Sequence, residues 1–315
     1  MQSTRPTSDP RNPLEVLVVG EAIMDIVVSA QGSVEHPGGS PTNVAYGLGR
    51  LGVETALLTS IGDDPRAAAI EQHLSGAGVT LLPGSRRPGR TATATATLAD
   101  DGSAHYDFDI RWTLPGTAPA TLPKILHTGS IATFLAPGAA AVKELLLQSH
   151  ERCLVTYDPN IRPALLGSHA EARSIFEELV PLTDVVKLSD EDAQWLYPGV
   201  HLDDVPGHIL GLGARLVAIT AGSRGSVLAT AQAHAVVPAV GSKVADTIGA
   251  GDSYMSALIH GLLHRGSEGL SASVLPSLGR TAAKAAAITV RRAGANPPTL
   301  AELHMDLPEQ EALVP

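Results

Sequence analysis

The hydrophobic pattern of this chain alternates between short apolar runs and longer amphipathic stretches. Apolar runs typical of buried strands lie at 14–19, 53–61, 125–129, 154–157, 185–188 and 216–220. Helical periodicity lies between them at 64–74, 139–148, 170–180 and 190–197. Strands that alternate with helices, with no hairpin turn between them, indicate βαβ units. The pattern therefore predicts an α/β fold whose parallel sheet is covered on both faces.

The stretch from 90 to 110 breaks this rhythm. Residues 90–98 alternate strictly and are rich in β-branched threonine, and a second alternating run passes through Tyr106 and Phe108. Asp100-Asp101-Gly102 between the two runs is a turn signal, so the stretch predicts a β-hairpin. The hairpin belongs either to the edge of the main sheet or to a small sheet that stands apart from it.

Asp25 stands inside a second apolar piece, 23–29, which closely follows the first strand. An unpaired carboxylate in such surroundings would be costly, so Asp25 is expected to bind either the protein's own backbone or a hydroxyl group of a ligand. A helix is predicted next, with Ser40 as its N-cap and Pro41 as its first residue. The glycines at 38 and 39 form a turn that a ligand can approach closely, and Asn43 lies in the first helical turn.

Several predicted strands end in polar residues. The clusters are His127-Thr128-Gly129, Asp158-Pro159-Asn160 with Arg162, Lys187 with Ser189, and Thr220-Ala221-Gly222. Ligand sites of open α/β sheets lie beyond the carboxyl ends of the strands, so these clusters are expected to converge. The sequence therefore predicts a binding crevice at this edge of the sheet.

The stretch Asp246-Thr247-Ile248-Gly249-Ala250-Gly251-Asp252 leads into a predicted helix. Apolar residues at 255, 258, 259, 262 and 263 form one stripe, which indicates an amphipathic helix that ends near Gly266. Gly249 and Gly251 allow a sharp turn, and the unpaired N–H groups of a helix start attract an anion. Asp252 would repel a phosphate bound there. It is therefore interpreted either as a base that takes the proton of an alcohol or as a residue near the helix cap.

Composition narrows the function classes. Of 315 residues, 44% are hydrophobic and 17% are charged, so the chain can build a large core. A net charge of −10 without a long basic run argues against nucleic acid or an anionic membrane as a main partner, and no apolar run is long enough to span a membrane. The one cysteine, Cys153, excludes an intrachain disulfide and fits a cytoplasmic location. Residues 1–13 are polar and proline-rich and are expected to form a flexible tail.

The sequence DTIGAGDSYMSALIHGLL closely resembles the C-terminal signature of the ribokinase-like (PfkB) carbohydrate kinases. The stretch HPGGSPTNVAYGLGRLG, with Asp25 before it, resembles the N-terminal signature of the same family, and the resemblance extends from Leu14 to Pro298. It implies a three-layer α/β sandwich, in which helices cover both faces of a central, mostly parallel sheet. It also implies a small β-sheet lid from strands at about 23–36 and 90–110, often shared across a dimer. The kinase domain is expected at 14–300, with a C-terminal tail at 301–315.

The resemblance implies a reaction in which ATP phosphorylates a sugar hydroxyl. Asp252 would take the proton of that hydroxyl, and the N–H groups of Gly249, Ala250 and Gly251 would stabilise the transferred phosphoryl group. The residues in matching places for the sugar are Asp25, Gly38, Gly39, Asn43, Asn160 and Arg162. Those for the nucleotide are Lys187, Ser189, Thr220, Gly222, Gly225 and Asn296. A structural salt bridge is an alternative role for Arg162.

Metal binding is implied with one departure from the family pattern. Many members carry Asn-x-x-Glu, which orders Mg²⁺ and the phosphates through water, whereas this chain has Ser189-Asp190-Glu191-Asp192. Asp192 takes the place of the glutamate, with Glu191 as an alternative, although three acidic residues also suit a first helical turn. Asp246, together with the loop after the last helix, would hold a monovalent cation such as K⁺.

Among substrates, D-fructose is expected, with fructose 6-phosphate as the product, because GEAIMDIV, DPNIRP and RAGANPP look most like bacterial fructokinases. Ribose, 2-keto-3-deoxygluconate and nucleosides are alternatives. A catalytically silent member that binds a sugar or nucleotide is another, but its usual mark, a lost base or a broken glycine turn, is absent from this sequence. A Rossmann dehydrogenase would need GxGxxG after the first strand, and Gly20-Glu21-Ala22-Ile23 does not supply it.

Overall fold

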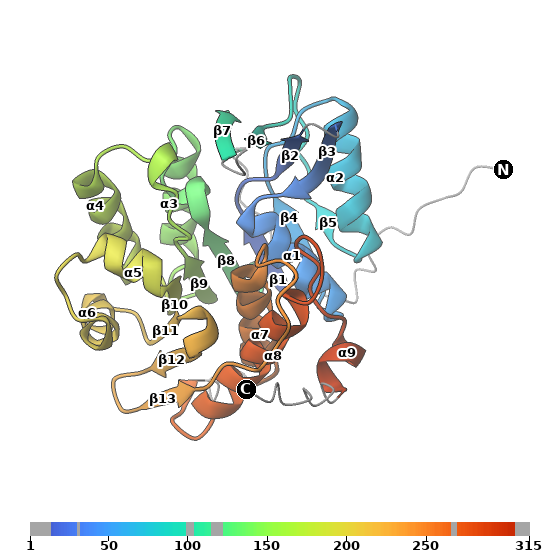
Figure 1. Cartoon of the computed structure of the whole chain (residues 1–315). Helices are drawn as coiled ribbons and strands as arrows, with labels where there is room; N and C mark the ends of the chain where they lie inside the picture. The colour runs from blue at the N-terminus through green and yellow to red at the C-terminus, as the bar shows by residue number, and fades with distance from the viewer. Residues whose placement is uncertain (1–13, 30–31, 99–103, 115–121, 266–269, 306–315) are drawn as a thin grey trace.

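The computed structural model describes residues 14–29, 32–98, 104–114, 122–265 and 270–305. Its centre is a nine-stranded sheet with the order β13-β12-β11-β10-β9-β8-β1-β4-β5 (Figure 1). The strands are β1 (Val16–Val19), β4 (Thr55–Leu58), β5 (Thr80–Leu81), β8 (Ile125–Gly129), β9 (Leu154–Asp158), β10 (Val185–Ser189), β11 (Leu216–Thr220), β12 (Ser226–Ala229) and β13 (His234–Val237). Neighbours from β5 to β11 pair in parallel, and β12 and β13 are antiparallel. The predicted α/β class is confirmed.

Helices cover both faces of this sheet. One face carries α1 (Ser40–Arg50), α2 (Pro65–Gly76), α7 (Ala250–Arg265), α8 (Leu275–Thr289) and α9 (Leu300–His304), and the other carries α3 (Gly138–Ser149), α4 (His169–Leu179), α5 (Asp190–Leu196) and α6 (Val205–Leu212). Strand β1 is apolar throughout because alternate residues of it pack into the cores on the two faces of the sheet. Val16 and Val18 pack in the core under α1 and α7, whereas Leu17 and Val19 pack in the core under α3 and α4.

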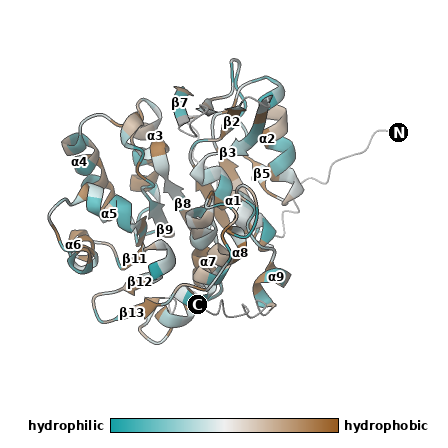
Figure 2. Cartoon of the chain, viewed as in Figure 1, coloured by the Kyte–Doolittle hydropathy of each residue, from teal (hydrophilic) through white to brown (hydrophobic). Residues whose placement is uncertain are grey.

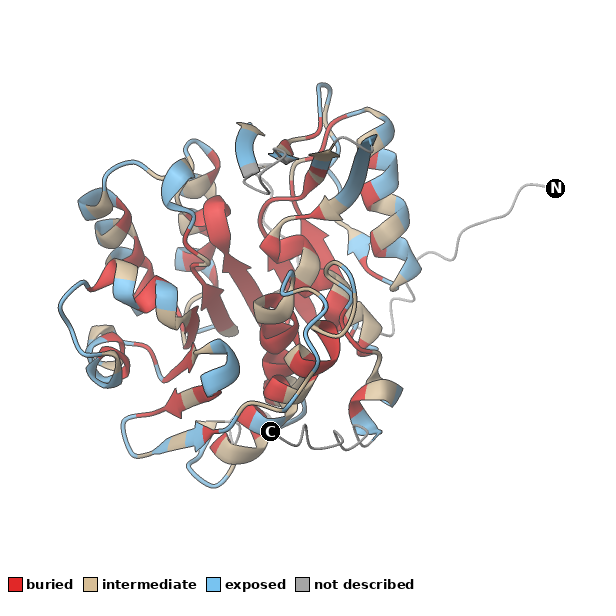
Figure 3. Cartoon of the chain, in the orientation of Figure 1, coloured by how far each residue is buried: buried red, intermediate tan, exposed pale blue. Residues whose placement is uncertain are grey.

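Burial follows the same layers. The inner strands of the main sheet and most of α7 are buried, whereas the edge strands β5 and β13 are largely not (Figure 3). The outer helices α2 and α4 show hydrophilic and hydrophobic residues side by side, as amphipathic helices do (Figure 2). Across the described part of the chain, every helix is too short or too polar to cross a lipid bilayer.

A second sheet stands apart from the main one at the top of the molecule in Figure 1. It has the order β3-β2-β6-β7, with β2 (Ile23–Ser29), β3 (Gly32–Gly38), β6 (Thr93–Leu98) and β7 (Ala104–Asp109). The antiparallel pair of β6 and β7 is the hairpin predicted at 90–110, although its predicted turn at 100–102 lies outside the described residues. Because β6 also pairs in parallel with β2, the hairpin is not an edge of the main sheet.

The helix boundaries differ from the sequence prediction in three places. The N-cap of α1 is Gly39 and not Ser40, whose hydroxyl is bonded elsewhere. The alanine-rich pattern predicts a helix only at 282–290, whereas α8 already begins at Leu275. Residues 301–304, expected in a tail, belong to α9 because the side chains of Thr299 and Glu302 make a capping box at its start. The expected tails at 1–13 and 306–315 lie outside the described residues.

Candidate active site

Asp252 lies in the first turn of α7, and its carboxylate is held by the first turn of α1. The hydroxyl of Ser40 donates to Oδ1 at 2.6 Å, and the side-chain amide of Asn43 donates to Oδ2 at 2.8 Å. Asp252 is only 9% exposed. Each oxygen thus has one fixed donor and keeps a lone pair for another partner. The geometry fixes the orientation of the carboxylate and leaves it able to accept a proton.

The two helix starts meet because α1 and α7 pack very closely. A Cβ on Gly47 would lie 2.4 Å from Oγ of Ser256, so only glycine fits there. The Ser256 hydroxyl is buried and donates both to the carbonyl of Val44 in α1 at 3.1 Å and to that of Asp252 in its own helix at 2.8 Å. A glycine facing a small hydroxyl residue therefore brings residues more than 200 positions apart into one site.

The start of α7 carries two glycines, of which Gly249 is required by its backbone conformation and its close neighbour. Gly249 has a φ of +75°, and a Cβ there would lie 2.7 Å from Cβ of Ala295. A Cβ on Gly251 would lie 3.0 Å from Nζ of Lys187. The N–H of Ala250 donates to the carbonyl of Thr247 at 3.2 Å, while within the described residues the N–H groups of Gly249 and Gly251 have no protein acceptor. Two of the three predicted donors are thus free to bind an anion at the helix start.

Asp25 has no hydrogen-bond donor among the described residues, so of the two partners considered for it the backbone one is not found there. Its carboxylate lies against Gly38, where a Cβ would come within 1.9 Å of Oδ2. Burial, reinforced by the negative charge of Asp252, raises the pKa of Asp25 to about 6, and the positive charges of Arg162 and His36 oppose this. The glycine leaves room for the carboxylate to reach a ligand.

Below the glycine turn, Lys187 on β10 and Asp158 on β9 form a buried ion pair. Nζ and Oδ2 are 2.8 Å apart, and the side chains are 5% and 1% exposed. Burial raises the pKa of Asp158 and Asp158 raises that of Lys187, so the pair is ionised at neutral pH. The ammonium group lies next to the glycine turn, where a Cβ on Gly251 would come within 3.0 Å of it.

The loop after β9 carries Asn160 and Arg162. Asn160 has a φ of +37°, and the guanidinium of Arg162 donates only to the carbonyls of Asn160 and Ile161, at 3.4 and 3.0 Å. No carboxylate of the described chain lies within ion-pair distance of Arg162, so the structural salt bridge considered for it is not formed. Its exposed guanidinium is available to a ligand.

Asp192 has structural partners for both carboxylate oxygens. Oδ2 accepts from the N–H of Ser189 at 3.0 Å within a capping box, and Oδ1 accepts from the N–H of Ile161 at 2.9 Å. It is 7% exposed, whereas the neighbouring Glu191 is exposed. The acidic residues do lie in the first turn of α5, and Asp192 both caps this helix and joins it to the loop of Asn160.

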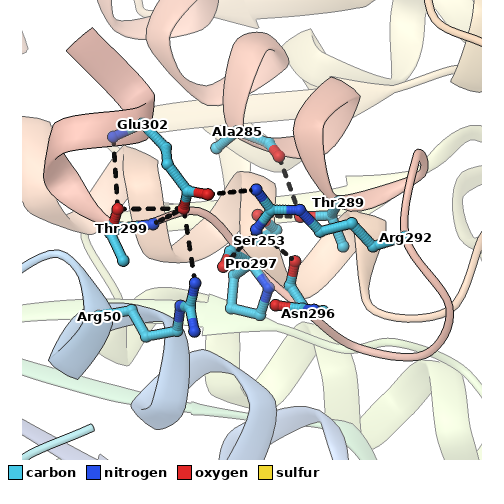
Figure 4. Close-up of polar contacts among 9 residues, drawn as sticks. All are labelled: Arg50, Ser253, Ala285, Thr289, Arg292, Asn296, Pro297, Thr299 and Glu302. Atoms are coloured by element: carbon cyan, nitrogen blue, oxygen red, sulfur yellow. Dashed lines mark hydrogen bonds and ion pairs between the residues drawn. The ribbon is translucent and has the colours of Figure 1, made fainter. Parts of the chain in front are cut away.

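The remaining predicted nucleotide residues lie at the ends of β11 and α8. Thr220 ends β11, Gly222 follows it, and Gly225 has a φ of +91° where a Cβ would lie 2.1 Å from the carbonyl oxygen of Val237. The loop that carries Asn296 follows α8, and the carbonyl of Asn296 accepts from the guanidinium of Arg292 (Figure 4). These segments lie at the same edge of the sheet as Asp252.

Asp246 ties two of these loops together. Its Oδ1 accepts from the N–H of Ile248 at 3.0 Å and its Oδ2 from the N–H of Gly294 at 2.8 Å. These backbone donors lower the pKa of Asp246, so the carboxylate stays ionised at neutral pH. The predicted cation residue therefore also positions the loop after α8.

Two polar residues that the structure brings to this region, Ser40 and Glu21, were not predicted as site residues from the sequence. Glu21 follows the first strand after one glycine and is 3% exposed, and its Oε2 accepts from the N–H of Ala132 at 3.2 Å. Burial raises its pKa to about 8. The polar-strand-end argument could have found Glu21, because it stands just beyond β1 at the point where the strand order reverses between β1 and β8.

The fold, the free N–H groups and the neighbouring carboxylate together define a ribokinase-like sugar kinase. The model of the pfkB family of carbohydrate kinases matches residues 14–302, and the chain belongs to that family. It is therefore a phosphotransferase that acts on a sugar hydroxyl.

Known relatives agree. The chain is 31% identical over 264 residues to a fructokinase of Rhizobium leguminosarum bv. trifolii, which covers 78% of this chain and 79% of that protein. It is 30% identical over 311 residues to fructokinase-2 of Solanum habrochaites, covering 91% and 94%. A solved fructokinase of Vibrio cholerae O395 with fructose, ADP and calcium superposes with a TM-score of 0.79 at 25% identity, covering 89% and 94%. A sugar kinase of Pyrococcus horikoshii in complex with ATP gives 0.75 at 26% identity, covering 91% and 96%.

Proposed function

We propose that this protein transfers the γ-phosphoryl group of ATP to a hydroxyl of D-fructose and forms fructose 6-phosphate and ADP. The observation that carries the proposal is the placement of the oriented Asp252 carboxylate beside the free N–H groups of Gly249 and Gly251. The fructokinases among its relatives, at about 30% identity, support fructose over other sugars.

In the proposed mechanism, Asp252 accepts the proton of the attacking sugar hydroxyl while the oxygen of that hydroxyl bonds to the γ-phosphorus. The bond between that phosphorus and the bridging oxygen breaks, and ADP leaves with the electron pair. Ser40 and Asn43 hold the carboxylate in line for this transfer. The N–H groups of Gly249 and Gly251, with the positive end of the α7 dipole, stabilise the charge on the phosphoryl group.

The sugar is proposed to lie between the small sheet and the loop after β9. Asp25 offers a carboxylate with no protein donor, and Asn43 keeps its amide oxygen free because its nitrogen binds Asp252. Gly38 and Gly39 allow the sugar to approach the backbone, and Asn160 and Arg162 line the opposite side.

ATP is proposed to bind along the ends of β10 and β11. Its contacts are Lys187, Ser189, Thr220, Gly222, Gly225 and Asn296. Lys187 lies under the phosphate-binding turn, where its charge offsets that of the phosphates. The solved relative from Pyrococcus horikoshii contains ATP, which supports this assignment.

Mg²⁺ would neutralise charge on the phosphates when bound. Asp192 fits a role through water, because each of its oxygens accepts one N–H and retains a lone pair, and Glu191 offers an exposed carboxylate beside it. No three acidic, histidine or cysteine side chains of the described residues form a metal cage, which agrees with an ion held mainly by phosphates and water. Asp246 is proposed to serve K⁺, and the solved fructokinase of Vibrio cholerae with potassium supports a cation in this fold.

The small sheet is proposed to act as a lid and as the contact of a homodimer. Val34 pairs with Val27, Val27 with Ala96 and Ala96 with Tyr106, so these side chains form one apolar row on the face that also carries Asp25. Val34, Val27 and Tyr106 are 54%, 37% and 59% exposed. Covering this row by a second copy would remove apolar surface from water beside the sugar site.

The test of the proposed function is ADP release with ATP and Mg²⁺ across fructose, ribose, glucose, 2-keto-3-deoxygluconate and adenosine. We expect turnover on fructose, with the product identified by ³¹P NMR as the 6-phosphate. Turnover on a different acceptor alone would retain the reaction and replace the substrate. ATP binding without turnover on any of the five would contradict the fructokinase assignment.

A further inference from the structure

The loop after α8, residues 291–298, contacts residues 246–251, the segment proposed to bind phosphate, at two points. The N–H of Gly294 donates to Oδ2 of Asp246 at 2.8 Å. Ala295 packs closely on Gly249, so that a Cβ added to Gly249 would lie 2.7 Å from the Cβ of Ala295. The position of this loop therefore decides the position of the turn that is proposed to bind phosphate.

The loop has little regular structure of its own. Its one internal backbone hydrogen bond joins the N–H of Asn296 to the carbonyl of Gly294 at 2.8 Å, and Gly294 has a φ of +66°. Proline follows at 297 and 298, which removes two further N–H donors. Such a segment needs partners outside itself to hold one conformation.

Arg292 lies within this loop, and its guanidinium joins other residues of the loop to Glu302, which lies outside it (Figure 4). Its Nη1 donates to the carbonyls of Asn296 and Pro297, each at 3.4 Å, and its Nη2 donates to Oε1 of Glu302 at 2.5 Å. One planar guanidinium thus fixes the carbonyl of Asn296 and that of the next residue. A lysine could not make these contacts together, because its ammonium is a single point of charge.

Glu302 is in turn held at the start of α9 (Figure 4). Its Oε2 accepts from the N–H and the hydroxyl of Thr299, at 2.8 and 3.0 Å, and from Nη2 of Arg50 at 3.5 Å. The Thr299 donors, together with Arg292, lower the pKa of Glu302 to about 2, so it is ionised at every physiological pH. The side chains of Arg292 and Glu302 are 26% and 37% exposed, so the pair is partly shielded from solvent.

We propose that Arg292 and Glu302 are positioning residues for the nucleotide: α9 holds Glu302, Glu302 holds Arg292, and Arg292 holds the loop of Asn296 against Gly249. This inference rests on the proposed nucleotide site. Neither residue need touch ATP, and neither was among the residues predicted from the sequence. The short helix after the loop thereby becomes part of the binding apparatus.

Two variants break the pair in different ways. Arg292→Lys keeps the charge and loses the planar group in which Nη1 contacts the two carbonyls while Nη2 contacts Glu302. Glu302→Gln keeps a residue suited to the capping box of α9 but loses the negative charge opposite Arg292. The matched control is Arg50→Gln, which removes the 3.5 Å contact to the same Glu302 and leaves the loop contacts in place.

The measurements are the Kd for ADP by calorimetry and the KM values for ATP and for the sugar. We expect both variants to weaken ADP binding and raise the KM for ATP about tenfold, with the sugar KM within about twofold of wild type. The control should bind ADP as wild type does. A wild-type protein that binds no ADP would refute the proposed function itself. Wild-type binding together with unchanged ADP affinity in Glu302→Gln, whose capping box is retained, would overturn the positioning role.

Discussion

The hydroxyl of Ser40 donates a 2.6 Å hydrogen bond to Oδ1 of Asp252, across 212 positions of sequence. The serine is the first residue of α1 and the aspartate lies in the first turn of α7, so each helix start fixes a polar group of the other. The bond makes the orientation of the proposed base depend on how the two helices pack.

Ser40→Ala should therefore lower kcat by about 10- to 100-fold, the range expected for one lost hydrogen bond to a charged group. Nucleotide affinity should stay close to wild type, because Ser40 has no contact with the nucleotide loops. The matched control is Thr42→Val in the same helical turn, whose hydroxyl donates to the carbonyl of Glu21 and not to Asp252. An equal loss of kcat in both variants would show a general effect on α1.

Asp252→Asn should lose most of its kcat, by roughly 10²- to 10⁴-fold, and retain ATP binding. The amide is close to the carboxylate in shape but cannot accept the proton of the sugar hydroxyl. Steady-state kinetics and calorimetry with ADP measure the two effects separately. A kcat near the wild-type value would refute the proposed role.

The buried pair of Lys187 and Asp158 predicts an asymmetric response to mutation. Lys187→Met should lower the free energy of unfolding by about 3–5 kcal/mol, because it leaves the Asp158 carboxylate buried without its cation. The double variant Lys187→Met with Asp158→Asn should be more stable than Lys187→Met alone, because neither charge remains. Urea denaturation of wild type, Lys187→Met, Asp158→Asn and the double variant gives the coupling energy between the two residues. Strictly additive losses of stability would argue against the pair.

His127 predicts a loss of stability in acid. Its ring is fully buried, with Nδ1 2.9 Å from the hydroxyl of Thr156 and Nε2 without a partner, and burial lowers its pKa from 6.5 to about 3. Between these values the unfolded chain binds the proton and the folded chain does not. Its contribution to stability is thus complete above pH 6.5 and falls as the pH drops towards 3.

At pH 5 the wild-type free energy of unfolding should have lost about 2 kcal/mol through this one group. His127→Asn, which does not titrate, should lack that part of the pH dependence. Urea denaturation at pH 7 and pH 5 measures the difference between the two proteins. Parallel pH profiles would mean that the buried ring takes up its proton without cost.

Most strands and helices of the main sheet could be predicted because burial on both faces leaves a strong local pattern. Val16, Leu17, Val18 and Val19 are all fully buried, and four apolar residues in a row predict that. The site was predicted less completely. Ser40 stands before a proline, which favours an N-cap interpretation, and only the tertiary packing of α7 supplies the competing acceptor.

Glu302 shows a signal that was present and not used. Thr299-Leu300-Ala301-Glu302 has the spacing of a capping box, which predicts a helix start where a tail was expected. Arg162 could not be assigned from sequence, because whether an arginine finds a carboxylate depends on which elements the fold brings near it. The sequence indicated two possible roles for Asp192, at the metal site and in the first turn of a helix. It could not indicate the contact with the N–H of Ile161, which comes from a distant loop.

The place of β1 inside the main sheet, between β8 and β4, has a consequence for the order in which the site can form during synthesis. Its partners β4 and β8 both leave the ribosome after it, and β8 begins only at Ile125. Helix α7, which brings Asp252 to Ser40, is synthesised later still. Contacts between such distant segments form slowly. The proposed catalytic carboxylate thus meets Ser40 only late in synthesis, and a nascent chain lacks the proposed site until α7 has been translated.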